Sequence, residues 1–261
     1  MNPTPGNTEV VDEMTQDLGQ ATYTIEGRTV TMPCVVRDAF SVASTYLVAS
    51  APARRLLPGP DIDVAEVLPG KGLLTLACID YRDNDLGDYN EVAISLFVRK
   101  RGNRSRPPYL GTAIDYFRSR LPTYIIHLPV NQGFTCEAGR RIWGFPKTVE
   151  QIDFSDDHNR CRLVMGGQHV LTFEVAAGGS GKTRIPDTTM ETYSYIDGKP
   201  HRNSFVSGAD GVTLRLGGSF VELGSHPIAA QLRSLGLPRR PLMTVRMERM
   251  HGRFEAPQPL L

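Results

Sequence analysis

The sequence has little of several features that mark common classes of protein. No apolar run reaches the about 18 residues that span a bilayer, so no transmembrane helix and no membrane partner are predicted. The N-terminal residues lack the basic and then apolar segments of a secretory signal, and we expect a cytoplasmic protein. The formal net charge of +1 provides no overall field to attract nucleic acid.

Cysteine and histidine are also sparse. The chain has four cysteines without a CxxC pair, and six histidines without HExxH or a similar close spacing. This pattern argues against a zinc site and against a disulfide framework. We therefore predict no metal ion.

What the sequence does have is a β-rich pattern in a chain of 261 residues, long enough for one large domain. Residues 1–20 look like a polar arm, and residues 21–261 look like a single domain. We expect a mainly β fold with a few short helices (α+β), whose large antiparallel sheet closes into a barrel or cone. The segments with strand-like patterns are 22–36, with a hairpin turn at Glu26-Gly27, and 72–81, 90–98, 123–130, 161–175, 211–223 and 242–254.

Three short helices are expected within this pattern. Asp38, Thr135 and Ser225 are each a plausible N-cap, followed by apolar residues at helical spacing. The third helix also has Pro227 in its first turn and Gly236 as a stop signal.

Lysine is scarce, since the chain carries 24 arginines and only five lysines. Lys147 alone is embedded among apolar residues, behind Phe145-Pro146 and the single tryptophan, Trp143. Burial disfavours the charged form, so an enclosed lysine has a lowered pKa. A neutral amine is a nucleophile whose natural electrophile is a carbonyl carbon. The alternative is a side chain that extends to place its ammonium in solvent.

The segment EAGRRIWGFPKT, which ends just after Lys147, resembles the active-site segment of acetoacetate decarboxylases, where a helix leads through an aromatic–proline pair into the Schiff-base lysine. LGDYNE is similar to the family segment that ends in its active-site glutamate, which implies that role for Glu91. YTIEGRTV resembles the N-terminal strand that carries an active-site arginine, which implies that role for Arg28. YIDGKP and SHPIAAQLRSLGLP are similar to the family's C-terminal half, so the resemblance runs from about residue 22 to 250.

The resemblance implies a cofactor-free enzyme that assembles as a homo-oligomer. Lys147 would form an imine with a small keto acid, most simply a β-keto acid such as acetoacetate, which then loses carbon dioxide. Glu91 would position the substrate or move protons, and Arg28 would bind the carboxylate through its bidentate fork. The candidate residues of the substrate pocket are Phe145, Trp143 and Tyr124.

Several alternatives stay open. Thr148 stands where the decarboxylases carry a second lysine, so burial alone would have to lower the pKa of Lys147. Residues 73–77 lack the acidic residue that the family tends to carry there, which predicts a more apolar pocket. The chain could instead be an imine-forming aldolase or dehydratase acting on pyruvate or another keto acid, or a non-catalytic barrel that binds a small ligand. Glu91 could be a surface cap, and Arg28 an exposed residue of the hairpin.

Overall fold

The structure is a computed structural model, and it describes residues 16–17, 20–103, 107–176 and 183–260. In these residues four helices occur: α1 (Ser50–Arg54), α2 (Leu110–Phe117), α3 (Gly133–Trp143) and α4 (Pro227–Ser234). No helix in the described part of the chain is long and apolar enough to cross a membrane. The strands pair into three sheets, as the described residues show.

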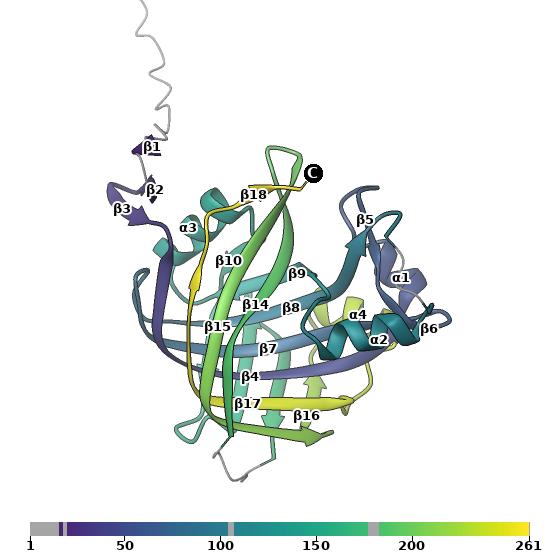
Figure 1. Ribbon diagram of the computed structural model, residues 1–261. Coiled ribbons are helices and arrows are strands. Elements are labelled where there is room, and N and C mark those ends of the chain that lie inside the picture. The colour runs from purple at the N-terminus through teal and green to yellow at the C-terminus, as the bar shows by residue number, and fades with distance from the viewer. Residues whose placement is uncertain (1–15, 18–19, 104–106, 177–182, 261) are drawn as a thin grey trace, which may run out of the picture.

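The largest sheet contains long strands that pair around a ring (Figure 1). Its pairing order is β10-β9-β14-β15-β17-β4-β7-β8-β5, and β9 also pairs with β8, which closes the ring from β9 round to β8. The bounds are β4 (Cys34–Ala49), β5 (Ile62–Val64), β6 (Glu66–Leu68), β7 (Lys71–Asn84), β8 (Tyr89–Lys100), β9 (Thr123–Val130), β10 (Lys147–Val149), β14 (Thr183–Ile196), β15 (Lys199–Leu216), β17 (Met243–Phe254) and β18 (Gln258–Pro259).

This sheet is mixed, so the prediction of a purely antiparallel sheet is wrong. Strand β9 runs parallel to β10 and to β14, whereas its pairing with β8 is antiparallel. The reason is the connection: α3 lies between β9 and β10 and returns the chain to the same end of the sheet. Parallel neighbours need such a crossover, which a tight hairpin cannot supply.

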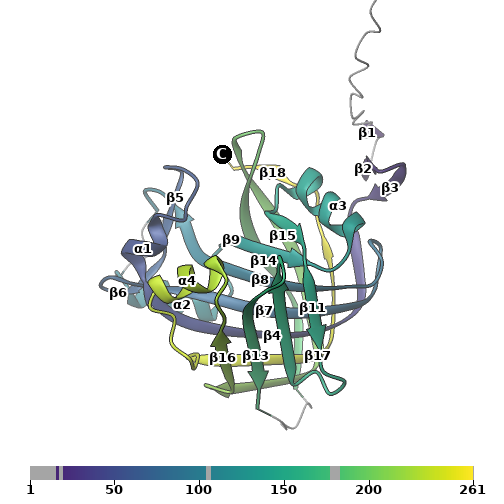
Figure 2. The ribbon, with the colours of Figure 1, turned by 180° about the vertical axis from the view of Figure 1, so that it is seen from behind.

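A second, four-stranded sheet lies across the first (Figure 2). Phe40 and Leu76 of the large sheet share one buried apolar cluster with Leu163 and Phe173 of the small sheet and with Leu232 of α4. We call this set the first cluster. The strands of the small sheet are β11 (Gln151–Phe154), β12 (Arg160–Met165), β13 (Gln168–Val175) and β16 (Ser219–Leu223).

A second buried cluster lies on the other face of the large sheet. It includes Ala39 and Val36 of β4, residues at the adjoining ends of β7, β8 and β9, and the buried face of α3. The N-terminal strands β1 (Gln16–Asp17), β2 (Gln20–Ile25) and β3 (Arg28–Thr31) form the third sheet, which lies beside α3 (Figure 1).

The helix predicted to begin at Asp38 is instead the long strand β4. Ala39 and Phe40 are adjacent and both fully buried, the first in the second cluster and the second in the first cluster. Because both faces of β4 are covered, its sequence does not alternate between apolar and polar residues, and periodicity alone cannot separate it from a helix.

The other two predicted helices exist, but their N-cap residues differ from the predicted ones. At the start of α3 the Gln132 side chain accepts a hydrogen bond of 2.8 Å from the Thr135 backbone nitrogen, so Gln132 is the cap and Thr135 lies in the first turn. At α4 the cap is His226 and not Ser225. The hairpin predicted at Glu26-Gly27 is confirmed, with both residues at positive φ.

The end of α3 is fixed by Gly144, which has φ of +65° and caps the helix in the left-handed conformation. A Cβ on Gly144 would lie 2.6 Å from the backbone oxygen of Tyr195 on β14. Only glycine therefore fits here, and this close approach sets where the chain enters β10.

We predict that Gly144→Ala destabilises the protein more than Gly198→Ala does. Gly198, in the turn between β14 and β15, has φ of +72° and nothing within 4 Å of a Cβ, so alanine there costs only the left-handed strain, about 1 kcal/mol. Gly144→Ala adds the contact with Tyr195, which we expect to cost a further 1 kcal/mol or more, roughly. Urea unfolding of the two variants measures the difference, and equal losses would contradict the structural role given to Gly144.

Candidate active site

Lys147 is the first residue of β10, and only 6% of its surface is exposed. Its strand pairs with β9, where Leu128 lies opposite Lys147. The alternative in which its side chain extends to solvent is therefore wrong, because the side chain is enclosed.

Glu91 lies on β8, on the other side of β9. It is opposite Val130, which shares a face of β9 with Leu128 because the two are two residues apart. Lys147 and Glu91 thus flank one strand and point to the same face, with their backbones about 10 Å apart across the sheet. Two long side chains span that gap: the Lys147 Nζ lies 2.9 Å from the Glu91 Oε2.

Both members of this pair are buried, since Glu91 is 6% exposed as well. It is therefore not a surface cap. Burial acts to lower the pKa of the Lys147 ammonium, but the carboxylate of Glu91, and to a lesser degree Tyr89, act against burial, and the pKa is raised from its ordinary value. The expectation of a lowered pKa for Lys147 is wrong for this arrangement, because an anionic partner sits against the buried amine.

Helix α3 closes the site from the side opposite the sheet. The Lys147 Nζ donates to the Thr135 Oγ1 at 3.4 Å. A Cβ on Gly139 would lie 2.5 Å from the Lys147 Cδ and 2.6 Å from its Cε, so the helix can pack this closely on the lysine stem only at a glycine. The segment GRRIWGFPK thus encodes both the lysine and the helix surface that encloses it.

Sequence reasoning missed two tyrosines in the site. The ring centroid of Tyr89 lies 4.9 Å from the Lys147 Nζ, and the Tyr81 hydroxyl donates to the Glu91 Oε1 at 3.5 Å. Strand alternation could have identified Tyr89, which is two residues before Glu91 and so on the same face of β8. Tyr81 could not have been found this way, because its position depends on the register between β7 and β8.

The predicted pocket residues Trp143 and Phe145 are buried beside the site. Their rings stack with centroids 6.2 Å apart, and the Trp143 Nε1 donates to the backbone oxygen of Glu255 at 3.0 Å. Trp143 also packs against Phe254. These contacts anchor the end of α3, so they hold Lys147 in place through the backbone.

The contacts of the other two predicted residues, Arg28 and Tyr124, are with other side chains than Lys147 and Glu91. Arg28 is exposed on β3, and its guanidinium lies 3.8 Å from the centroid of the Phe134 ring on α3. Tyr124 is half-buried on β9 and packs against the first cluster, whereas Lys147 lies among residues of the second. Their proposed roles toward the substrate stay predictions.

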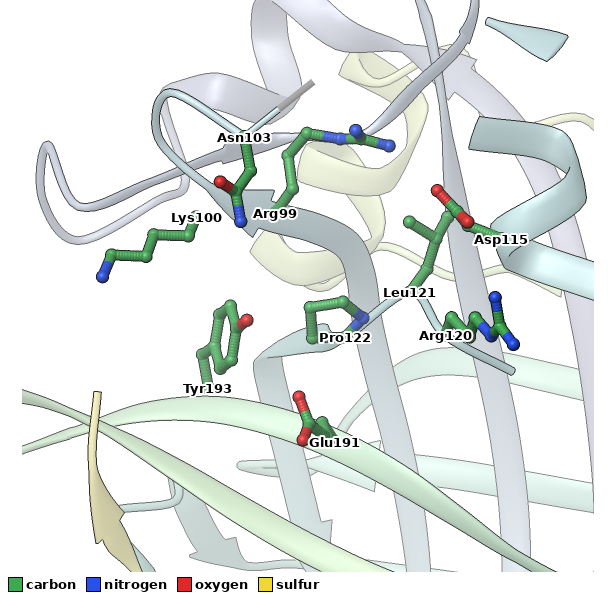
Figure 3. A pocket seen from close by; sticks show the side chains of 9 residues that line it. All are labelled: Arg99, Lys100, Asn103, Asp115, Arg120, Leu121, Pro122, Glu191 and Tyr193. Atoms are coloured by element: carbon green, nitrogen blue, oxygen red, sulfur yellow. The ribbon is translucent and has the colours of Figure 1, made fainter. Parts of the chain in front are cut away.

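A pocket of about 340 Å³ opens at the far end of β8 (Figure 3). Arg99 is eight residues along the strand from Glu91, which corresponds to about 26 Å. This pocket is therefore separate from the Lys147–Glu91 pair. It is lined by Arg99, Lys100, Asn103, Asp115, Arg120, Leu121, Pro122, Glu191 and Tyr193.

Among the described residues, no group of three or more histidine, cysteine, aspartate or glutamate side chains is placed to hold a metal ion. What the site offers chemically is an amine, a carboxylate and three hydroxyl groups from Thr135, Tyr81 and Tyr89 in an enclosed space. Such a set can transfer protons to and from a nitrogen that attacks a carbonyl carbon.

The chain matches the family model described as acetoacetate decarboxylase over residues 21–216. No curated protein sequence matches it. An acetoacetate decarboxylase of known structure is 15% identical with a TM-score of 0.60, over 87% of this chain and 89% of that one. The acetoacetate decarboxylase from Legionella pneumophila is also 15% identical with a TM-score of 0.60, over 88% and 87%. The enduracididine biosynthesis enzyme MppR complexed with pyruvate has the same identity and TM-score, over 90% and 93%.

We predict that Glu91→Gln lowers the pKa of Lys147 below the wild-type value, because the substitution removes the anion that opposes burial. In the wild type, the raised pKa means that the pair stabilises the fold at neutral pH and that this contribution is lost as pH rises through the folded pKa. The ¹³Cε chemical shift of Lys147, followed by NMR against pH, measures the change.

Glu137→Gln is the matched control, since Glu137 lies on α3, the helix that covers Lys147, but pairs with Arg141 and not with the lysine. It should leave the titration of Lys147 unchanged. A Glu91→Gln titration that coincides with the wild type would show that Glu91 does not set the charge of the amine.

Proposed function

The chain belongs to the acetoacetate decarboxylase family, and from this we propose that it is a Schiff-base-forming lyase whose Lys147 condenses with a small keto acid. The observation that carries the proposal is the buried Lys147–Glu91 pair, at 2.9 Å. A buried ion pair adds little to stability compared with apolar residues of similar volume, so its presence favours a chemical role. The most direct reaction is decarboxylation of a β-keto acid such as acetoacetate, with no cofactor.

The first step requires a neutral amine. Glu91 Oε2 lies within hydrogen-bond distance of Nζ and can accept the ammonium proton. This transfer turns two buried charges into two neutral groups and leaves the net charge of the site unchanged, which suits an enclosed environment. The amine then attacks the keto carbon, and the carbonyl oxygen leaves as water after taking up protons, with Glu91 as the nearest donor.

The imine then serves as the electron sink. When the bond to the carboxylate breaks, its electron pair enters the protonated C=N group, carbon dioxide leaves, and a neutral enamine remains on Lys147. Protonation of the enamine carbon and hydrolysis release the ketone and restore the amine. Buried apolar residues such as Phe145 and Leu128 favour the loss of carbon dioxide. In that step the positive charge of the imine and the negative charge of the carboxylate disappear together.

A second candidate function is aldol condensation or dehydration with pyruvate. Two solved structures of one similar protein support it: MppR with pyruvate, and MppR with the condensation product of pyruvate and imidazole 4-carboxaldehyde. The same imine on Lys147 would serve, and Glu91 would remove a proton from the pyruvate methyl group in place of carbon dioxide loss.

The threonine at position 148 argues less strongly against decarboxylation than the absence of a second lysine in the sequence implies. It is exposed and next to Lys147 on β10, so it points away from the face that Lys147 shares with Glu91. A lysine at this position of this chain would face solvent. The substitution therefore does not by itself argue against decarboxylation.

We predict that borohydride, added with acetoacetate or with pyruvate, attaches the keto acid covalently to the peptide containing Lys147, as read by peptide mass spectrometry. Release of carbon dioxide from acetoacetate assigns decarboxylation, and trapping of pyruvate without gas release assigns the second function. Lys147→Arg should abolish labelling. Arginine is chosen because it keeps a cation beside Glu91. Loss of that cation would leave a buried charge unpaired and cost about 3–5 kcal/mol.

Lys199→Arg is the matched control for that variant. Lys199 is exposed at the start of β15, so its replacement should leave labelling and gas release unchanged. A folded wild-type protein that neither labels nor releases carbon dioxide with either compound would contradict the proposal and favour a non-catalytic ligand-binding role.

A further inference from the structure

Two buried tyrosines stand directly opposite each other beside the Lys147–Glu91 pair. Tyr81 on β7 and Tyr89 on β8 are register partners, and they are 2% and 5% exposed. Their rings stack with centroids 4.4 Å apart. Stacking between two buried rings on paired strands leaves each ring little freedom to turn.

Tyr81 holds the carboxylate. Its hydroxyl donates to the Oε1 of Glu91, while Lys147 occupies the Oε2. The two oxygens of Glu91 therefore have different partners, one on each side. This fixes the plane of the carboxylate and reserves one oxygen for the amine.

Tyr89 holds the nitrogen. The Lys147 Nζ lies 4.9 Å from its ring centroid, which is within the about 6 Å over which a cation is attracted to the negative face of an aromatic ring. The Tyr89 hydroxyl interacts with Thr135, and the Thr135 Oγ1 accepts from the same Nζ. The negative ring face favours a cationic nitrogen over a neutral one, whereas the threonine hydroxyl can hydrogen-bond to either form.

We propose that the stacked pair Tyr81–Tyr89 is a positioning element that keeps the Lys147 nitrogen against Glu91 and favours its cationic forms, first the ammonium and then the protonated imine. The proposal rests on the proposed function for its second part. A protonated imine carries its charge on the same nitrogen as the ammonium, so the ring that attracts one attracts the other. The protonated form is the one that accepts the electron pair released with carbon dioxide, and it is also the form that borohydride reduces.

The test replaces Tyr89 with phenylalanine and, at the same position, with trifluorophenylalanine installed by nonsense suppression. Both keep the size and stacking of the ring, but fluorine withdraws the negative charge from its face. In the free proteins, the ¹³Cε titration of Lys147 should occur at lower pH with trifluorophenylalanine than with phenylalanine. This readout needs no substrate, so it separates the ring contact from the proposed reaction.

The second readout is imine trapping with whichever keto acid labels the wild type. Trifluorophenylalanine should lower the trapped fraction at neutral pH by about five- to thirtyfold relative to phenylalanine, as expected for loss of a buried cation–aromatic contact. Phenylalanine is the reference for this comparison, because it lacks the hydroxyl in the same way as trifluorophenylalanine and differs from it only in the charge of the ring face. Tyr81→Phe, which keeps the stacking and removes the hydrogen bond to Glu91, should lower kcat.

Tyr193→Leu is the matched control for loss of a buried ring. Tyr193 is 8% exposed on β14 and lines the separate pocket at the far end of β8, so its replacement should change neither readout. Identical Lys147 titrations for phenylalanine and trifluorophenylalanine at position 89 would overturn the proposal. If neither the wild type nor any variant forms an imine, the proposed function fails, and so does the claim that the stacked pair favours the protonated imine. The titration of Lys147 still decides whether Tyr89 holds the ammonium.

Discussion

The site depends on one strand, β9, having a partner on each edge at its C-terminal end. Strand β8 supplies Glu91 on one edge and β10 supplies Lys147 on the other, and their register places both side chains on one face. The side chains of a lysine and a glutamate are together long enough to meet across a single strand. A shift of either strand by one residue would turn one side chain to the opposite face and break the pair.

The helix between β9 and β10 makes this arrangement possible and encloses it. Because β10 is parallel to β9, the chain must cross over, and α3 both makes the crossover and covers the amine. Gly139 allows the helix to touch the lysine stem, and Gly144 ends the helix at the one place where the chain fits against β14. The same short segment therefore supplies Lys147, the helix that covers it and the turn that joins them.

The Lys147–Glu91 pair shows why burial alone does not determine whether a lysine is charged. Burial disfavours the ammonium, but an anion in direct contact favours it, and here the anion prevails. The amine is held charged at rest, and an internal proton transfer to Glu91 is what would release its reactivity. Positions 81 and 89 add to this balance from the sheet side, through one hydroxyl and one ring face.

The sequence by itself predicted most of the strands and the helix that precedes the lysine, and through short motifs it named Lys147 and Glu91 as candidate site residues, because local alternation and short motifs encode these features. It did not reveal β4 as a strand, since a strand covered on both faces lacks alternation. The parallel pairing of β9, the contact between Lys147 and Glu91, the direction of the lysine pKa shift and the place of Tyr81 were decided by tertiary structure alone. Each depends on which strands become neighbours and in what register, and pairings between residues far apart in the chain leave no local trace in the sequence.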